Sequence, residues 1–103
     1  MKLDMYHEDA ILVNAIAYYG NHTQTLVAIE ELSELQKELC KYLRNEATDE
    51  YDISTLEENI IEEIADVEIM LKQLKILHSC EANVEKVKKE KIRRLYERMH
   101  GGS

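Results

Sequence analysis

The chain of 103 residues contains no proline and only three glycines, at position 20 and at positions 101 and 102. Proline and glycine are the residues that most often interrupt helices. Without them, the long stretch from residue 21 to residue 100 is free to form extended helices. The full length of 103 residues corresponds to about one domain. We therefore predict a single all-α domain over residues 1–100, followed by a flexible tail at residues 101–103.

The first two helices are predicted from the spacing of apolar residues. The first covers residues 4–19 and ends at Gly20, after which residues 21–23 supply candidate N-caps for the next helix. The second covers about residues 25–44 and contains the most regular apolar stripe in the chain. That stripe consists of Ala28, Leu32, Leu35, Leu39 and Leu43. Its steps of three and four residues place it on one face of a helix.

Two further helices are predicted in the second half of the chain. Residues 45–52 are acidic and aperiodic, which predicts a loop, and Ser54-Thr-Leu-Glu57 has the pattern of a capping box that begins a third helix near Ser54. A break near residues 79–83 then precedes a last helix that ends at about Met99. The third helix carries the apolar stripe Leu56, Ile60, Ile64, Val67, Leu71 and Leu74. We expect a four-helix bundle, and small size favours its oligomerisation.

Charge and hydropathy exclude several classes of function. The chain has 13 Lys and Arg against 21 Asp and Glu, a net charge of −8. Nucleic acid is therefore not an expected partner, because such proteins carry a basic surface. No segment approaches the ~20 consecutive apolar residues of a membrane span, and residues 1–4 do not begin a signal peptide. Cys40 and Cys80 are too few for a disulfide framework. We expect a cytoplasmic protein with no membrane partner.

Two acidic segments on the second and third helices resemble each other. They are Glu30-Glu-Leu-Ser-Glu34 and Glu62-Glu-Ile-Ala-Asp66. Acids three residues apart stand on one helix face and can reach one cation. At ~100° per residue, the acids nearest the apolar stripes are Glu31, Glu34, Glu63 and Asp66. Carboxylates at the edge of a core need a positive partner, and an all-oxygen set selects a hard ion, best Mg2+, with Mn2+ as an expected substitute.

Two alternatives to a magnesium site remain. The acids are also explained as solvated helix faces, since a single Glu-x-x-Glu has little specificity. A ferritin-like di-iron site requires Glu-x-x-His from two helices. The chain has that pattern only between Glu97 and His100, at the end of the last helix, so a di-iron site is the weaker interpretation.

The last helix is basic in an otherwise acidic chain. Its positive residues also complement the helix dipole near its C-terminus. The helical projection places Lys91 and Arg98 within an apolar stripe and Arg94 at its edge, so that all three are expected to point toward the bundle. Such cations either pair with acids or hold the oxygens of a phosphate.

These residues carry a resemblance to a known family. The segment from Tyr19-Gly20 through Glu31-x-x-Glu34, together with Glu63-x-x-Asp66, looks like the MazG-like branch of the all-α nucleoside triphosphate pyrophosphohydrolases, over about residues 15–98. The resemblance implies that the four acids hold Mg2+ and that a nucleoside triphosphate and water give the monophosphate and pyrophosphate. It also implies that a homodimer or homotetramer forms the sites, and that Lys91 and Arg94 contact the phosphates.

The same resemblance suggests roles for further residues. Where the family often has an aromatic residue that recognises the base, this chain has Tyr18 or Tyr19 and no tryptophan. Asn14, Tyr18 and Gln24 are available to the base and sugar. Glu31 or Glu34 is expected to act as the general base, with Glu30 in support. Two alternative functions are a non-catalytic helical oligomerisation or interaction module and a phosphoribosyl-ATP pyrophosphohydrolase.

Overall fold

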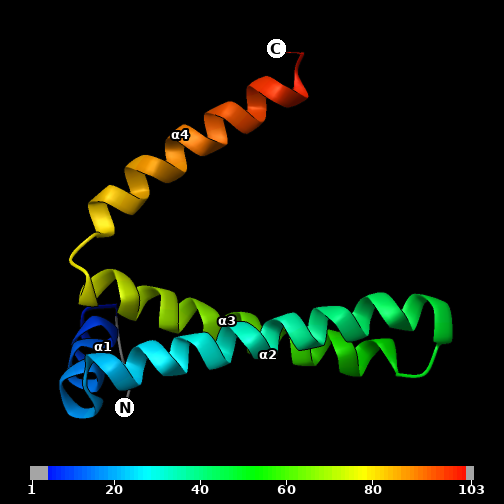
Figure 1. The fold of residues 1–103 in the computed structure, drawn as a ribbon, viewed down its shortest axis with the longest axis horizontal. Coiled ribbons are helices and arrows are strands. Elements are labelled where there is room, and N and C mark those ends of the chain that lie inside the picture. Colours follow the sequence, from blue (N-terminus) through cyan, green and yellow to red (C-terminus); the bar gives the residue numbers. More distant parts are fainter. Residues whose placement is uncertain (1–4, 102–103) are drawn as a thin grey trace.

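The computed structural model describes residues 5–101 and is built from four helices. They are α1 (Met5–Tyr19), α2 (Asn21–Thr48), α3 (Ile53–Leu77) and α4 (Glu81–Met99). Helices α2 and α3 lie side by side and antiparallel, α1 lies across the end where α2 begins, and α4 projects away from the other three (Figure 1). The described residues contain no strand, which confirms the all-α prediction for this part of the chain. No helix among them is long and apolar enough to span a membrane.

A single glycine separates α1 from α2. Gly20 has φ of 93°, a conformation that side chains with a Cβ rarely adopt, and its N–H donates to the carbonyl of Ile16 at 2.8 Å. The predicted helix end at Gly20 is confirmed. The prediction of N-caps at residues 21–23 is wrong, because α2 begins at Asn21 with Gly20 itself as the N-cap and no side-chain cap. The carbonyl of Gly20 already accepts from the N–H of Gln24 at 3.1 Å.

Helix α2 extends one turn beyond its predicted end. Residues 45–48 are helical, so the predicted loop over 45–52 is reduced to residues 49–52. The buried Asn45 accounts for the difference, because its side-chain Oδ1 accepts a hydrogen bond from the backbone N–H of Tyr51 at 2.7 Å. Asp49 ends the helix in the left-handed region, and its N–H donates to the carbonyl of Asn45 at 2.9 Å. The side chain of Asn45 therefore closes the turn that joins the end of α2 to Tyr51.

The N-cap of α3 also differs from the sequence prediction. The helix begins at Ile53, and Oδ2 of Asp52 accepts a hydrogen bond from the backbone N–H of Thr55 at 3.2 Å. The capping box predicted to begin at Ser54 is therefore wrong, because the aspartate two residues earlier already caps the helix. Aspartate and serine are comparable N-caps, so the sequence alone does not decide between them.

The seam between α2 and α3 is more polar than the apolar stripes predict. Its buried apolar residues are Ala28, Leu56, Val67 and Met70, and its buried polar residues are Gln24, Glu38, Asn45 and Gln73. Gln24 and Gln73 satisfy each other through an Nε2 to Oε1 hydrogen bond of 2.7 Å. By contrast, Leu32, Leu39 and Leu43 of the predicted α2 stripe are exposed. The stripe therefore lies only partly in the seam.

Helix α4 does not close a bundle with the other helices of its own chain. None of its residues is buried. The radius of gyration is 17.5 Å, whereas a compact chain of this length has about 13 Å. The predicted four-helix bundle is therefore not complete within one chain: α1, α2 and α3 pack together, and α4 extends from them (Figure 1).

Candidate metal centre

Three carboxylates converge at the middle of the α2–α3 seam. Glu31 comes from α2, and Glu63 and Asp66 come from α3, with one oxygen of each within 4.8 Å of the others. Glu63 and Asp66 stand on successive turns of one helix face, and the antiparallel packing brings Glu31 opposite them. We call these three residues the acidic cluster. Glu31 and Glu63 are half-buried and Asp66 is exposed, so the cluster opens to solvent on one side.

Among residues 5–101, no positively charged side chain pairs with the cluster. Burial, followed by the negative charges of Asp66 and Glu63, raises the pKa of Glu31 above its ordinary value. The Oε2 atom of Glu63 is buried and has no hydrogen-bond partner. Over the described part of the chain, no lysine or arginine forms an ion pair with any of the three carboxylates. A cation from solution would supply the positive charge that the described residues do not bring to the cluster.

The donor set fits a hard divalent cation. The donors are carboxylate oxygens, and neither histidine nor cysteine belongs to the cluster. Oxygens on opposite sides of Mg2+ are about 4.2 Å apart and those around Ca2+ about 5 Å. The spacing of up to 4.8 Å therefore suits one ion of this kind after a small side-chain adjustment. Exposure of Asp66 leaves room for water or phosphate oxygens as further ligands.

Glu34, the fourth acid of the predicted site, lies outside the converging group. It is exposed on α2, one turn beyond Glu31. The helical projection places it on the same flank of α2 as Glu30, next to the open side of the cluster. The structure thus brings three of the four predicted ligands together and leaves Glu34 in solvent.

The predicted substrate-binding residues lie apart from one another. Lys91 and Arg94 are exposed on α4, the helix that projects away from the cluster (Figure 1). Tyr18 is 82% exposed and contacts Tyr19 edge to face, with 4.8 Å between ring centroids. Gln24 is buried, and its amide is engaged by Gln73. Within one chain these four residues do not form a pocket with the acidic cluster.

Sequence reasoning missed Glu38. This residue is buried on α2, and its Oε2 has no hydrogen-bond partner, while Oε1 lies 3.4 Å from Nζ of Lys41. The signal was present as a seven-residue repeat of polar residues along α2, namely Gln24, Glu31, Glu38 and Asn45. A repeat of seven returns to nearly the same helix face, so it marks the side of α2 that meets α3.

Comparison of the chain with protein families, with curated proteins and with solved structures found no match. The fold and the site define a class, an all-helical protein with a carboxylate cluster on an antiparallel helix pair.

The raised pKa of Glu31 predicts how stability depends on pH in the absence of metal. The folded protein binds this proton more tightly than the unfolded chain, so its free energy of unfolding is expected to rise as the pH falls from neutrality toward 4.5, the ordinary glutamate value. Chemical denaturation in a chelator at several pH values measures this. Glu31→Gln should flatten the profile in that range. An equally steep rise in the variant would contradict the assignment.

Proposed function

We propose that this protein is a Mg2+-dependent nucleoside triphosphate pyrophosphohydrolase that converts a nucleoside triphosphate and water into the monophosphate and pyrophosphate. The observation that carries the proposal is the convergence of Glu31 with Glu63 and Asp66, from two acidic motifs about thirty residues apart, around a buried and unpartnered carboxylate oxygen. The resemblance of those motifs to the MazG-like pattern supports the reaction. We place the protein in the cytoplasm, in nucleotide-pool housekeeping or regulation.

The four acids have distinct places in this proposal. Glu31, Glu63 and Asp66 would hold the ion, and Glu34, exposed one turn further along α2, would be the fourth acid of the site. Mg2+ held there would supply the positive charge that lets a chain of net charge −8 bind a triphosphate. The protein then has to position the phosphates and a water in line. Either Glu31 or Glu34 accepts the proton of that water, and Glu30 supports whichever of these two residues acts as the base.

The remaining substrate contacts require more than one chain. Lys91 and Arg94 are assigned to the phosphate oxygens, as charge-assisted donors, yet both lie on a helix that leaves the cluster of its own chain. We therefore propose that a homodimer or homotetramer supplies them from a neighbouring copy. Tyr18 is assigned to the nucleobase, because its ring is exposed. Gln24 is assigned a supporting role, since its amide is already paired.

A second candidate function is a non-catalytic helical oligomerisation or interaction module. The large number of exposed apolar residues favours it, since twenty large apolar side chains among the described residues are exposed. The two functions differ in their dependence on metal. A module is indifferent to Mg2+ and releases no pyrophosphate, whereas the proposed enzyme requires the ion for turnover.

The decisive experiment is a substrate panel. The protein is incubated with Mg2+ and each canonical and damaged ribo- or deoxyribonucleoside triphosphate, and with phosphoribosyl-ATP, and the monophosphate and pyrophosphate are quantified. Turnover of one or more triphosphates supports the proposal. Turnover of phosphoribosyl-ATP alone supports a phosphoribosyl-ATP pyrophosphohydrolase. Absence of pyrophosphate from every compound, with Mg2+ or Mn2+, would favour the interaction module.

Mg2+ is expected to stabilise the folded protein. An ion that binds only the folded state adds about 2.7 kcal/mol when present at a hundred times its dissociation constant. For a domain of this size that corresponds to a rise of roughly 10 °C or more in melting temperature. Differential scanning fluorimetry with and without millimolar MgCl2 measures it, with KCl of equal ionic strength as the control. An equal response to both salts would count against an ion site.

A further inference from the structure

A pocket lies at the turn where α3 ends and α4 begins, and we call it the elbow pocket. Its apolar walls are Leu71 and Leu74 of α3 and Val84 of α4, and its volume is about 350 Å3. Small-molecule pockets typically measure ~300–1,000 Å3 and combine apolar walls with a few polar groups. No residue of the acidic cluster lines the elbow pocket. It is therefore a separate space with room for a small ligand.

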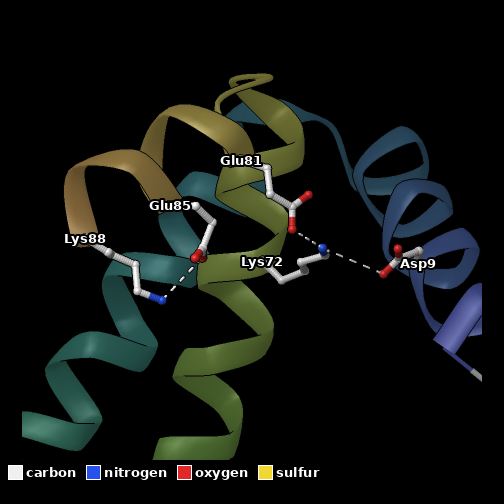
Figure 2. Close-up of polar contacts among 5 residues, drawn as sticks. All are labelled: Asp9, Lys72, Glu81, Glu85 and Lys88. Atoms are coloured by element: carbon white, nitrogen blue, oxygen red, sulfur yellow. Dashed lines mark hydrogen bonds and ion pairs between the residues drawn. The ribbon is translucent and has the colours of Figure 1, made fainter. Parts of the chain in front are cut away.

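Backbone hydrogen bonds and an ion pair join the two helices that form the pocket. Ser79 has φ of 51°, and the N–H of Cys80 donates to the carbonyl of Lys75 at 3.0 Å, which closes the turn. Lys72 of α3 pairs with Glu81 in the first turn of α4 (Figure 2). Neither partner of this ion pair lines the pocket. The walls thus come from two helices that are tied at the turn and diverge beyond it (Figure 1).

The charged side chains that line the elbow pocket are all basic. Lys75, His78 and Lys88 belong to its lining, whereas no aspartate or glutamate of residues 5–101 does. The histidine can donate a hydrogen bond in either protonation state. In a chain of net charge −8, such a lining favours an anion and disfavours a cation.

Lys75 is the lysine that is available to a ligand. It is half-buried in the last turn of α3, and its ammonium forms no ion pair with another residue of the described chain. Its charge contributes to the lowered pKa of Glu81, after the hydrogen bond from Lys72 that occupies this carboxylate. Lys88, by contrast, pairs with Glu85 at 3.3 Å (Figure 2). The pocket therefore matches a ligand with a single negative charge.

We infer that the elbow pocket binds a small apolar carboxylate, an aliphatic or aromatic acid whose carboxylate meets Lys75 and whose apolar body contacts the leucines and the valine of the walls. A nucleoside triphosphate does not match this site, because it carries several negative charges and the pocket has one unpaired lysine. Lys91 and Arg94 stand in later turns of α4 and do not line the pocket. The inference is therefore independent of the proposed catalysis.

Isothermal titration calorimetry in chelator, without nucleotide, tests binding separately from any activity. The probes are octanoate and phenylacetate, which represent the aliphatic and the aromatic acid. Octanol and phenylethanol are the controls that lack the charge, and acetate is the control that lacks the apolar body. At least one acid is expected to bind once per chain, about tenfold or more tighter than its controls, because its carboxylate gains a charge-assisted hydrogen bond. The tighter acid identifies the class. Binding of neither acid, or equal binding of the uncharged controls, would overturn the inference.

The two cysteines of the chain show where the acid binds. Cys80 is half-buried in the pocket lining, whereas Cys40 is exposed on α2 and directly follows the exposed Leu39. Both are alkylated with iodoacetamide, and the modified peptides are quantified by mass spectrometry. At ten times its dissociation constant, the acid should slow modification of Cys80 roughly tenfold and leave Cys40 unchanged. General adsorption to exposed apolar surface would slow both, and that result, or no protection of Cys80, would contradict the site.

Val84→Glu places a negative charge in the pocket wall and should weaken binding of the acid by about 100-fold or more, since like charges repel strongly in an apolar site. Val87→Glu is its matched control, because Val87 is 49% exposed on the same helix and does not line the pocket. Equal binding by these two variants would overturn the inference.

Lys75→Gln removes the charge that the carboxylate meets and should weaken binding about tenfold. Lys89→Gln makes the same change in net charge at an exposed position of α4 outside the lining and should bind as the unmodified protein does. Circular dichroism checks that every variant keeps its helices. If Val84→Glu fails to fold, the two lysine variants decide, and equal affinities in them would refute the site.

Discussion

Glu63→Gln is expected to reduce pyrophosphate release by at least about 100-fold at saturating Mg2+, because losing roughly 3 kcal/mol of charge stabilisation at the phosphates slows turnover by two orders of magnitude. The substitution keeps the size and shape of the side chain while removing one negative ligand from the acidic cluster. It also removes the charge of a group whose Oε2 is buried without a partner. The metal-free variant should therefore melt no lower than the unmodified protein.

Glu62→Gln provides the matched control for this result. Glu62 precedes Glu63 on α3, is exposed and does not belong to the acidic cluster, and its replacement makes the same change in net charge. Turnover by this variant should stay within about twofold of the unmodified protein, as is usual for a surface substitution. Equal losses in the two variants would mean that net charge, rather than ligation at Glu63, supports the activity. Full activity in Glu63→Gln would refute the site.

Leu56→Ala is expected to lower the free energy of unfolding by about 2–5 kcal/mol, the cost of truncating a buried leucine and leaving a cavity. Leu56 is 1% exposed and is the largest fully buried side chain among the described residues. Only four apolar residues are buried there in one chain, so one such loss removes a large share of the packing between α2 and α3. Urea denaturation monitored by circular dichroism in chelator measures the change.

Ile61→Ala serves as the reference for the leucine truncation. Ile61 lies on the same helix and is 66% exposed. The free energy of unfolding of the Ile61→Ala variant should lie within about 0.5 kcal/mol of the value for the unmodified protein. Comparable losses of unfolding free energy at positions 56 and 61 would show that another surface covers Ile61 in solution. The core would then not be confined to the seam between α2 and α3.

The number of helices and their approximate positions followed from local features of the sequence. Absence of proline kept the helices long, and Gly20 marked the one-residue break that its φ of 93° requires. Helix ends were predicted less well, because several polar residues near each end are capable of capping. Contacts with residues further along the chain decided among them: Asn45 bonds to the backbone of Tyr51, which extends α2, and Asp52 rather than Ser54 caps α3.

The candidate site was predictable only in part, because some of its contacts are local in sequence and others join separate helices. Spacing of three residues on one helix is a local property, so the pairing of Glu63 with Asp66 could be read from the sequence. Their meeting with Glu31 depended on the register of α2 against α3, which the buried pair of Gln24 and Gln73 helps to fix. The exposed position of Glu34 and the burial of Glu38 follow from that same register.

The sequence by itself determined the all-helical class, the acidic motifs and the amphipathic character of each helix, because these depend on periodicities within a few turns of chain. Only the tertiary structure decided which face of each helix is buried. Packing of α2 on α3 placed polar residues in the seam and left leucines such as Leu32 and Leu39 outside it. The turn between α3 and α4 likewise brings together residues that periodicity does not relate, since Lys72 of α3 pairs with Glu81 in the first turn of α4 and lies 4.0 Å from Asp9 of α1 (Figure 2). Burial depends on how surfaces of separate helices match, and periodicity within one helix does not contain that information.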